Sequence, residues 1–402
     1  MSDRPRTTAR PSEPDHAAVP PPPRDPSRPP SARPRGIGPI TLAIVAIAFV
    51  AGSTSSVVWA LEQGHEHRAP TPVHLQHAVA TATSPSGHSG HAAPAPAPAQ
   101  DAGFESYRRP DPTLPAVPQG RVKRFRIDVL MHVTKVSDDA PSLRVWSFGV
   151  NGRFMRGTGV SPPMVVEQGD RVEVTLVNGA SEAMHVDMPH SLDVHAAEVA
   201  PNRAFKTIPP GASTHYSFVA RDPGVFMYHC ATEPMVLHLG AGMAGMFVVK
   251  PHHMPKVDRE LWLVQQEFFI GRRPGADSDY GKMLAERPDV VAFNGYADQY
   301  MRHPIRVAAG ERIRMYVLNP GPTHTSSFHV IGAVFDRMWS EGVTGGPAQV
   351  MTLAPSTGGY VDFTLRHEGA FPFVDHNFAS MAKGAMGALV TAHAPRDAVT
   401  SF

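Results

Sequence analysis

The chain has 402 residues, which is enough for two or three domains with sizeable cores. Its 37 basic and 36 acidic residues give a formal net charge of +1, so the overall charge does not point to nucleic acid or to an acidic surface as a partner. A single cysteine excludes an intrachain disulfide framework, and the 22 histidines indicate metal chemistry only where their spacing supports it.

Two segments of contrasting composition begin the chain. Residues 1–36 are rich in proline and arginine and hold almost no large apolar side chains, so they cannot offset their ordering entropy and we expect a disordered tail. Residues 37–61 carry no charge and are mostly apolar. About 20 apolar residues cross the hydrocarbon core as a helix, so this run predicts a transmembrane anchor.

The charges before the anchor predict its orientation. The tail holds seven arginines against four acidic residues, which predicts a cytoplasmic N-terminus and places everything after Glu62 on the extracytoplasmic side of the cell membrane. A cleaved signal peptide is the competing interpretation. We favour the single-pass anchor because the apolar run is long and residues 55–61 show no convincing small-x-small cleavage site.

A linker of alanine, proline, threonine and serine occupies residues 62–119. This composition predicts an extended, semi-rigid spacer that lifts the globular part off the membrane. Metal scavenging by its histidines is conceivable, but we interpret them as compositional drift. The linker histidines are His65, His67, His74, His77, His88 and His91.

A sequence motif occurs twice in the globular part of the chain. The turn Val150-Asn151-Gly152 precedes two alternating strands in residues 163–178, and Phe293-Asn294-Gly295 precedes the same pattern in residues 304–319. Such a repeat implies two copies of one domain.

Short strands with glycine and proline turns predict an all-β fold, a Greek-key β-sandwich or small barrel in each copy. The two domains are expected at residues 120–252 and 253–402, with the junction near residues 251–257. Helix is scarce, and residues 277–287 are the best helical candidate.

Soft metal ligands cluster around Cys230, the only cysteine. His238 follows it by eight residues and Met243 by a further five. Two imidazoles, a thiolate and a long axial thioether make a mononuclear blue-copper site, so one histidine must come from elsewhere. An inert buried cysteine is the alternative for a lone cysteine. We favour copper because the ligand string directly follows an apolar, aromatic run.

The missing histidine lies in residues 188–197. If this run is extended, successive side chains point to opposite faces, so Asp193 and His195 share one face while His190 takes the other. His229 and Cys230 likewise point in opposite directions. One site then consists of His190, Cys230, His238 and Met243. A second site receives His195 and His229, with Asp193 nearby.

The second site has only two imidazoles, too few for a stable copper or zinc centre. The second copy of the repeat offers His329 and His376, and it has no cysteine of its own. Either could be an ordinary core histidine, but the unfinished ligand set favours a metal role.

These residues resemble a known family, the copper-containing, NO-forming nitrite reductases, which are built of two cupredoxin domains. The resemblance spans roughly residues 120–395, and the motifs match in order and in spacing. It implies one type 1 and one type 2 copper per chain. The implied type 1 ligands are His190, Cys230, His238 and Met243, and the implied type 2 ligands are His195, His229 and His376.

The resemblance also implies active-site roles. Asp193 and His329 match the family's catalytic aspartate and histidine, and Ile331 matches the apolar residue that narrows the pocket. The implied reaction is the reduction of nitrite to nitric oxide by one electron passed through Cys230-His229. A homotrimer is implied in which His376 completes the site of a neighbouring subunit. The implied electron donor is a small cupredoxin or a c-type cytochrome.

Several positions depart from the family pattern. Ser191-Leu192 and Val194 replace the more usual Asn-Val and Phe, and the step from Cys230 to His238 fits a subgroup with a shorter ligand loop. No departure removes a ligand, so we expect them to affect rate and redox potential rather than the reaction.

Two other functions are open to a protein of this sequence but fit it less well. A laccase-like multicopper oxidase needs paired His-x-His motifs and a histidine on both sides of the cysteine, whereas Ala231 follows Cys230 and no such pair occurs after residue 120. A non-enzymatic cupredoxin that only relays electrons would not need Asp193 and His329 beside a second ligand set.

Overall fold

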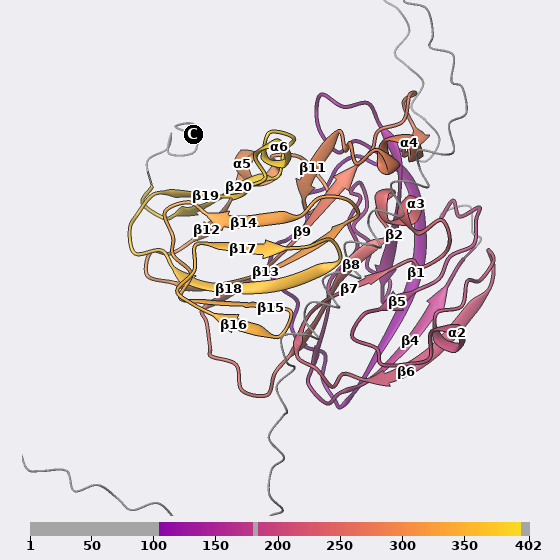
Figure 1. The fold of residues 1–402 in the computed structure, drawn as a ribbon, viewed down its shortest axis with the longest axis horizontal. Coiled ribbons are helices and arrows are strands. Elements are labelled where there is room, and N and C mark those ends of the chain that lie inside the picture. Colours follow the sequence, from indigo (N-terminus) through magenta and orange to yellow (C-terminus); the bar gives the residue numbers. More distant parts are fainter. Residues whose placement is uncertain (1–103, 180–183, 395–402) are drawn as a thin grey trace, which may run out of the picture. The chain divides into compact units, whose positions relative to one another are not determined.

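The computed structural model describes residues 104–179 and 184–394. These residues fold into two β-sandwiches, one from each copy of the repeat, so the all-β expectation is confirmed (Figure 1). The expected tail, the transmembrane anchor and most of the linker lie outside the described residues. No helix within those described ranges is long and apolar enough to cross a membrane.

The first sandwich has two sheets with an apolar core between them. The core contains Trp146, Phe148, Tyr228, Cys230 and Phe247, all at most 1% exposed. One sheet has the strand order β10 (Ala276–Asp277), β2 (Leu143–Val150), β1 (Val122–Thr134), β4 (Arg171–Val177) and β6 (Ser213–Val219). The other has the order β3 (Met164–Glu167), β8 (Ala244–Lys250), β7 (Gly224–His229) and β5 (Asp193–Val194).

The second sandwich repeats this plan and adds strands at its edges. One sheet runs β11 (Val290–Phe293), β9 (Arg259–Phe268), β13 (Arg312–Gly321), β18 (Thr357–Thr364), β15 (Arg337–Ser340) and β16 (Val343–Gly345). The other runs β12 (His303–Val307), β20 (Met386–Thr391), β19 (Ala370–Asp375), β14 (Ser326–Val330) and β17 (Val350–Leu353).

The pairing of the strands shows the repeat directly. β1 pairs in parallel with β4, and β9 pairs in parallel with β13. In both copies the Asn-Gly turn has two residues with positive φ, and the asparagine accepts a hydrogen bond from a backbone N–H of the neighbouring strand. A positive φ at two successive positions favours Asn-Gly over other pairs, which explains why this dipeptide marks both copies.

The described helices are all short: α2 (Pro201–Ala204), α3 (Met235–Gly240), α4 (Tyr280–Leu284), α5 (Gln299–Arg302) and α6 (Phe378–Met381). The helix expected at residues 277–287 is therefore present but shorter than predicted. Asp277 pairs with β2 instead, and the Asp279 side chain caps α4 by accepting a hydrogen bond from Lys282 N. Glu286 adopts a φ of 54°, which does not continue an α-helix.

Candidate metal centres

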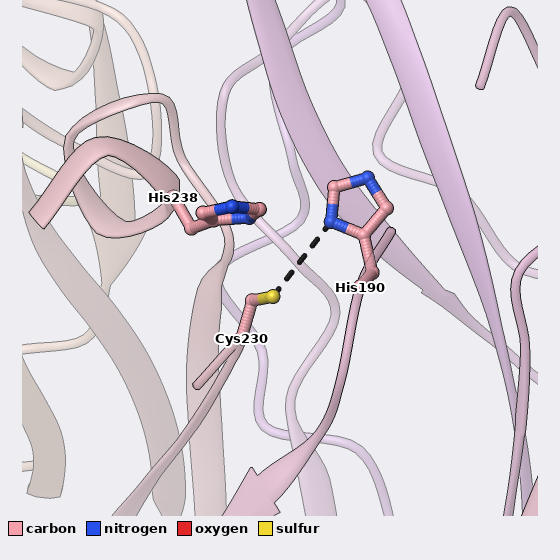
Figure 2. A group of neighbouring side chains, drawn as sticks. All are labelled: His190, Cys230 and His238. Atoms are coloured by element: carbon pink, nitrogen blue, oxygen red, sulfur yellow. Dashed lines mark hydrogen bonds between the residues drawn. The ribbon is translucent and has the colours of Figure 1, made fainter. Parts of the chain in front are cut away.

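The first ligand group lies at one end of the first sandwich. Cys230 directly follows β7, His238 lies in α3, and His190 lies in a loop that bridges to Ile208. His190 and Cys230 are fully buried and His238 is 3% exposed. Figure 2 shows the two imidazoles on either side of the thiol, with His190 Nδ1 at 3.7 Å from Cys230 Sγ. The structure thus brings together three residues that the sequence assigned to one site.

The protonation states and the hydrogen bonding of this group's donor atoms fit a bound metal ion. Burial lowers the pKa of His190 to about 3 and that of His238 to about 4, so both imidazoles are neutral near pH 7. His238 Nδ1 is buried and has no hydrogen-bond partner among the described residues. Neutral imidazole and thiolate are the forms that bind copper, so the group fits that ion.

Backbone hydrogen bonds return the end of the ligand loop to its start. Met243 N donates to His238 O at 3.0 Å, and Cys230 N donates to Met243 O at 3.1 Å. The Met243 side chain is fully buried in the core of the first sandwich. His190, Cys230, His238 and Met243 therefore form a site of type 1 character.

A network of hydroxyl groups surrounds the cysteine sulfur. Ser191 N lies 3.4 Å from Cys230 Sγ, and Ser191 Oγ accepts hydrogen bonds from Ala231 N and Thr232 Oγ1 at 3.0 and 3.1 Å. Thr207 Oγ1 continues the chain at 3.0 Å from Thr232 Oγ1. Burial raises the pKa of the Cys230 thiol, and the Ser191 N–H opposes that shift.

The second ligand group lies on the opposite face of the same strand pair. Asp193 in β5 is opposite His229 in β7, and His195 follows β5. His229 Nδ1 lies 2.9 Å from Cys230 O, so Nδ1–H donates to that carbonyl. The Nε2 atom of the neutral ring then carries no proton, and its lone pair is available to a metal ion. His229 Nε2 is 3.1 Å from His195 Nε2 and 3.8 Å from an Asp193 carboxylate oxygen. Two imidazole nitrogens directed at one point are a suitable start for a metal site.

His329 and His376 form a separate pair in the second sandwich. Their ring centroids are 4.8 Å apart. His329 lies in β14 and His376 directly follows β19, and both are half-buried. His376 does not join the group of Asp193, His195 and His229 within the chain. Ile331 lies two residues beyond His329 and is 38% exposed.

Comparison with known proteins agrees with these two groups. The profile of the multicopper oxidase family matches residues 134–254 and 280–395. The copper-containing nitrite reductase of Neisseria meningitidis (strain Z2491) is 36% identical over 288 residues, which cover 68% of this chain and 71% of the relative. That of Neisseria gonorrhoeae is also 36% identical, over 68% and 70% of the two chains. The chain belongs to the family of copper-containing nitrite reductases.

Solved structures of the same family support the assignment. The copper nitrite reductase of Nitrosomonas europaea matches with a TM-score of 0.60 and 28% identity, covering 68% of this chain and 94% of that one. A multicopper oxidase structure matches with a TM-score of 0.57 at 21% identity, which shows only that the fold is shared. Both sandwiches are cupredoxin-like.

In this nitrite reductase family member, Trp146 contacts the first site, although nothing in the sequence singled it out. Its ring lies edge-on to the rings of His190 and His238, at centroid distances of 5.9 and 5.1 Å. Its indole N–H donates to Asp277 Oδ1 at 3.2 Å. Asp277 belongs to the second copy, so only the fold brings these residues together. A buried tryptophan in a strand does not by itself indicate that a metal site is nearby.

Proposed function

We propose that this protein reduces nitrite to nitric oxide and water, a reaction that consumes one electron and two protons. The observation that supports this most directly is the adjacency of His229 and Cys230. These two neighbours point into different ligand groups, so one peptide unit joins the two candidate sites. An enzyme that must deliver single electrons to a bound substrate needs such a short connection.

The proposed type 2 ligands are His195, His229 and His376, beside the type 1 set of His190, Cys230, His238 and Met243. Copper, when bound, would supply a one-electron carrier at the first site and a Lewis acid for nitrite at the second. The chain contributes neutral imidazoles, held in one tautomer at His229 by the Cys230 carbonyl.

Proton delivery is assigned to Asp193 and His329. The Asp193 carboxylate lies beside the paired Nε2 atoms of the second group, where a bound oxyanion would receive a proton. His329 Nδ1 lies 2.5 Å from Gln349 O and donates to it, so Nε2 is the atom available to exchange protons. Ile331 would border the substrate pocket as its apolar wall.

A homotrimer is part of the proposal. Within one chain, His376 lies with His329 rather than with His195 and His229. A third imidazole supplied by another copy of the chain would complete the second site. Phe378 lies two residues after His376, and its ring is 5.2 Å from the His376 ring. It is 62% exposed, which is typical of an apolar residue that a partner surface covers. Sedimentation of the purified protein tests this directly.

The remaining parts of the proposal concern the ends of the molecule. Residues 37–61 would anchor the chain in the cell membrane with residues 1–36 in the cytoplasm, and residues 62–119 would hold the enzyme on the extracytoplasmic side. A small cupredoxin or a c-type cytochrome would deliver electrons there. Mass spectrometry of the mature N-terminus tests the anchor, since a start beyond Ala60 would show cleavage instead.

The decisive experiment is a nitrite assay. Purified, copper-loaded protein is mixed with a reduced dye and nitrite, and nitric oxide is measured directly. Production of nitric oxide by protein with two coppers per chain supports the proposal. Absence of nitric oxide in such protein favours an electron relay, and consumption of oxygen instead favours the multicopper oxidase alternative.

A further inference from the structure

Asp375 is a fully buried carboxylate at the end of β19, directly before His376. Its Oδ1 accepts hydrogen bonds from Ser327 N and from Asn377 N, both at 2.8 Å. Its Oδ2 accepts from Gln265 Nε2, also at 2.8 Å. In the part of the chain that the structure describes, no basic side chain forms a salt bridge with it.

These bonds tie together the two segments that bear His329 and His376. Ser327 lies in β14 two residues before His329, and Asn377 follows His376. Ser327 is held from both sides, because its N–H donates to Asp375 while its carbonyl accepts from His376 N at 2.8 Å. One carboxylate thus fixes the backbone on either side of His376 and the strand that leads to His329.

Gln265 anchors the carboxylate to the opposite sheet. Gln265 lies in β9, is 1% exposed, and accepts a hydrogen bond from Ser326 Oγ at 2.7 Å. Asp375 therefore has little freedom to rotate, since each of its oxygen atoms is held by a different part of the sandwich.

Burying a carboxylate is costly even when it is hydrogen-bonded, and apolar residues can often replace buried charged groups without loss of stability. A buried carboxylate that contacts both sides of a proposed ligand therefore points to a role beyond stability. We infer that Asp375 is a positioning residue that sets the His376 imidazole, and the His329 imidazole beside it, in the geometry that the second copper site needs. This inference rests on the proposed function.

Glu267 provides a matched control. It also lies in β9, is 1% exposed, and accepts hydrogen bonds from Thr323 N, Thr323 Oγ1 and His324 N. None of its hydrogen bonds involves His376 or Asn377. Glu267→Ala therefore removes a buried carboxylate that accepts several hydrogen bonds in the same sandwich, while the hydrogen bonds of Asp375 to Ser327 N and Asn377 N remain.

The experiment compares full-length wild type with Asp375→Ala, Asp375→Asn and Glu267→Ala. Copper per chain and copper affinity are measured by titration, the type 2 signal by electron paramagnetic resonance, and unfolding of the metal-free proteins by calorimetry. We expect Asp375→Ala to bind the second copper about 10- to 100-fold more weakly, the usual effect of losing such support, while the first copper stays bound. Glu267→Ala should lower the unfolding temperature yet keep the wild-type affinity for both coppers.

Asp375→Asn should restore most of the affinity. Its single amide oxygen can accept from both Ser327 N and Asn377 N, and the Gln265 amide can rotate by half a turn to accept from the new NH₂ group. Because Asn has nearly the same shape as Asp but no charge, this rescue would exclude a role of the negative charge itself. A purely space-filling role is tested by Gln265→Met, which keeps most of the side-chain volume but removes the hydrogen bond to Oδ2. If Asp375→Ala does not fold, Gln265→Met carries the same test, because it leaves Oδ2 without a donor and should also weaken the second copper.

The outcomes separate this inference from the proposed function. An Asp375→Ala protein with a wild-type second copper site, or a Glu267→Ala protein that loses that site equally, overturns the positioning role while the reaction stands. A wild-type protein that binds two coppers but forms no nitric oxide overturns the reaction, and the copper affinities still decide the role of Asp375. A wild-type protein that binds only one copper overturns both.

Discussion

His195 and His229 face each other with their Nε2 atoms 3.1 Å apart, although His195 follows β5, His229 ends β7, and the two lie 34 residues apart in the sequence. His229 is 6% exposed and its Nδ1 is tied to the Cys230 carbonyl. Its imidazole is therefore fixed in direction before any metal arrives.

Substitution of His229 should remove the second copper and leave the first one bound. His229→Ala removes a proposed type 2 ligand but leaves Cys230 and its sulfur contacts in place. We expect the second copper to be lost and the intense visible absorption of the first site to remain. Absorption and copper analysis of the same sample check this. A protein that keeps two coppers would contradict the assignment of His229.

Cys230→Ser should give the opposite result. The hydroxyl of serine is a hard, weakly acidic ligand that does not replace a thiolate. The visible absorption should disappear, and the second site should keep its copper because His195, His229 and His376 are intact. Electron paramagnetic resonance distinguishes the remaining type 2 signal from none. Survival of the visible absorption would show that Cys230 is not a ligand.

Asp193→Asn and His329→Ala should each reduce turnover by about 10²-fold or more, the scale expected for proton-transfer groups. Both coppers should stay bound, because neither residue is assigned as a ligand. Nitric oxide formation per copper-loaded chain is the measurement. Full activity in either variant would exclude that residue from proton delivery.

Ser191→Ala should alter the first site without emptying it. The change leaves Ala231 N without its acceptor, at a cost of about 1–3 kcal/mol for an unpaired buried donor, whereas the Thr232 hydroxyl can donate to Thr207 Oγ1 instead. The Ser191 N–H close to the sulfur should then be held less firmly, so we expect a lower reduction potential because hydrogen bonds to the sulfur stabilise the reduced site. Potentiometric titration of the visible absorption checks the direction. An unchanged potential would limit the Ser191 hydroxyl to a structural role.

Removal of copper should destabilise the first sandwich more than the second. Four buried ligand side chains lose their metal there, and binding at a ligand concentration a thousand times the dissociation constant contributes about 4 kcal/mol to the free energy of unfolding. Calorimetry before and after chelation should show a lower unfolding temperature that copper restores. No change on chelation would argue against tight binding in the native state.

Much of this site could be predicted because its signals are local in the sequence. The alternation that separates His190 from Asp193 and His195 needs only an extended backbone. The structure groups His190 with Cys230 and groups Asp193 with His195, although only Asp193–Val194 of this run is a strand. The helix at residues 277–287 was overestimated because the pairing of Asp277 with β2 is a contact with the other domain. The supporting roles of Trp146, Ser191 and Asp375 were not found, because the partners Asp277, Thr232 and Gln265 lie 131, 41 and 110 residues away and no spacing rule links them. The domain boundaries at residues 120–252 and 253–402 and the individual metal and catalytic roles stay predictions.

Strand β10 prevents the two copies of the repeat from being separated without damage to the first one. It comes from the second copy of the repeat but completes a sheet of the first, and its Asp277 holds the indole that packs on the ligands His190 and His238. A gene cut at the junction between the copies would therefore yield a first half with an open sheet edge and a loosened tryptophan. Such a half-protein would not reproduce the copper site of a small blue-copper protein. The two copies share one plan, but the first depends on the second for a strand and for the contact that holds Trp146.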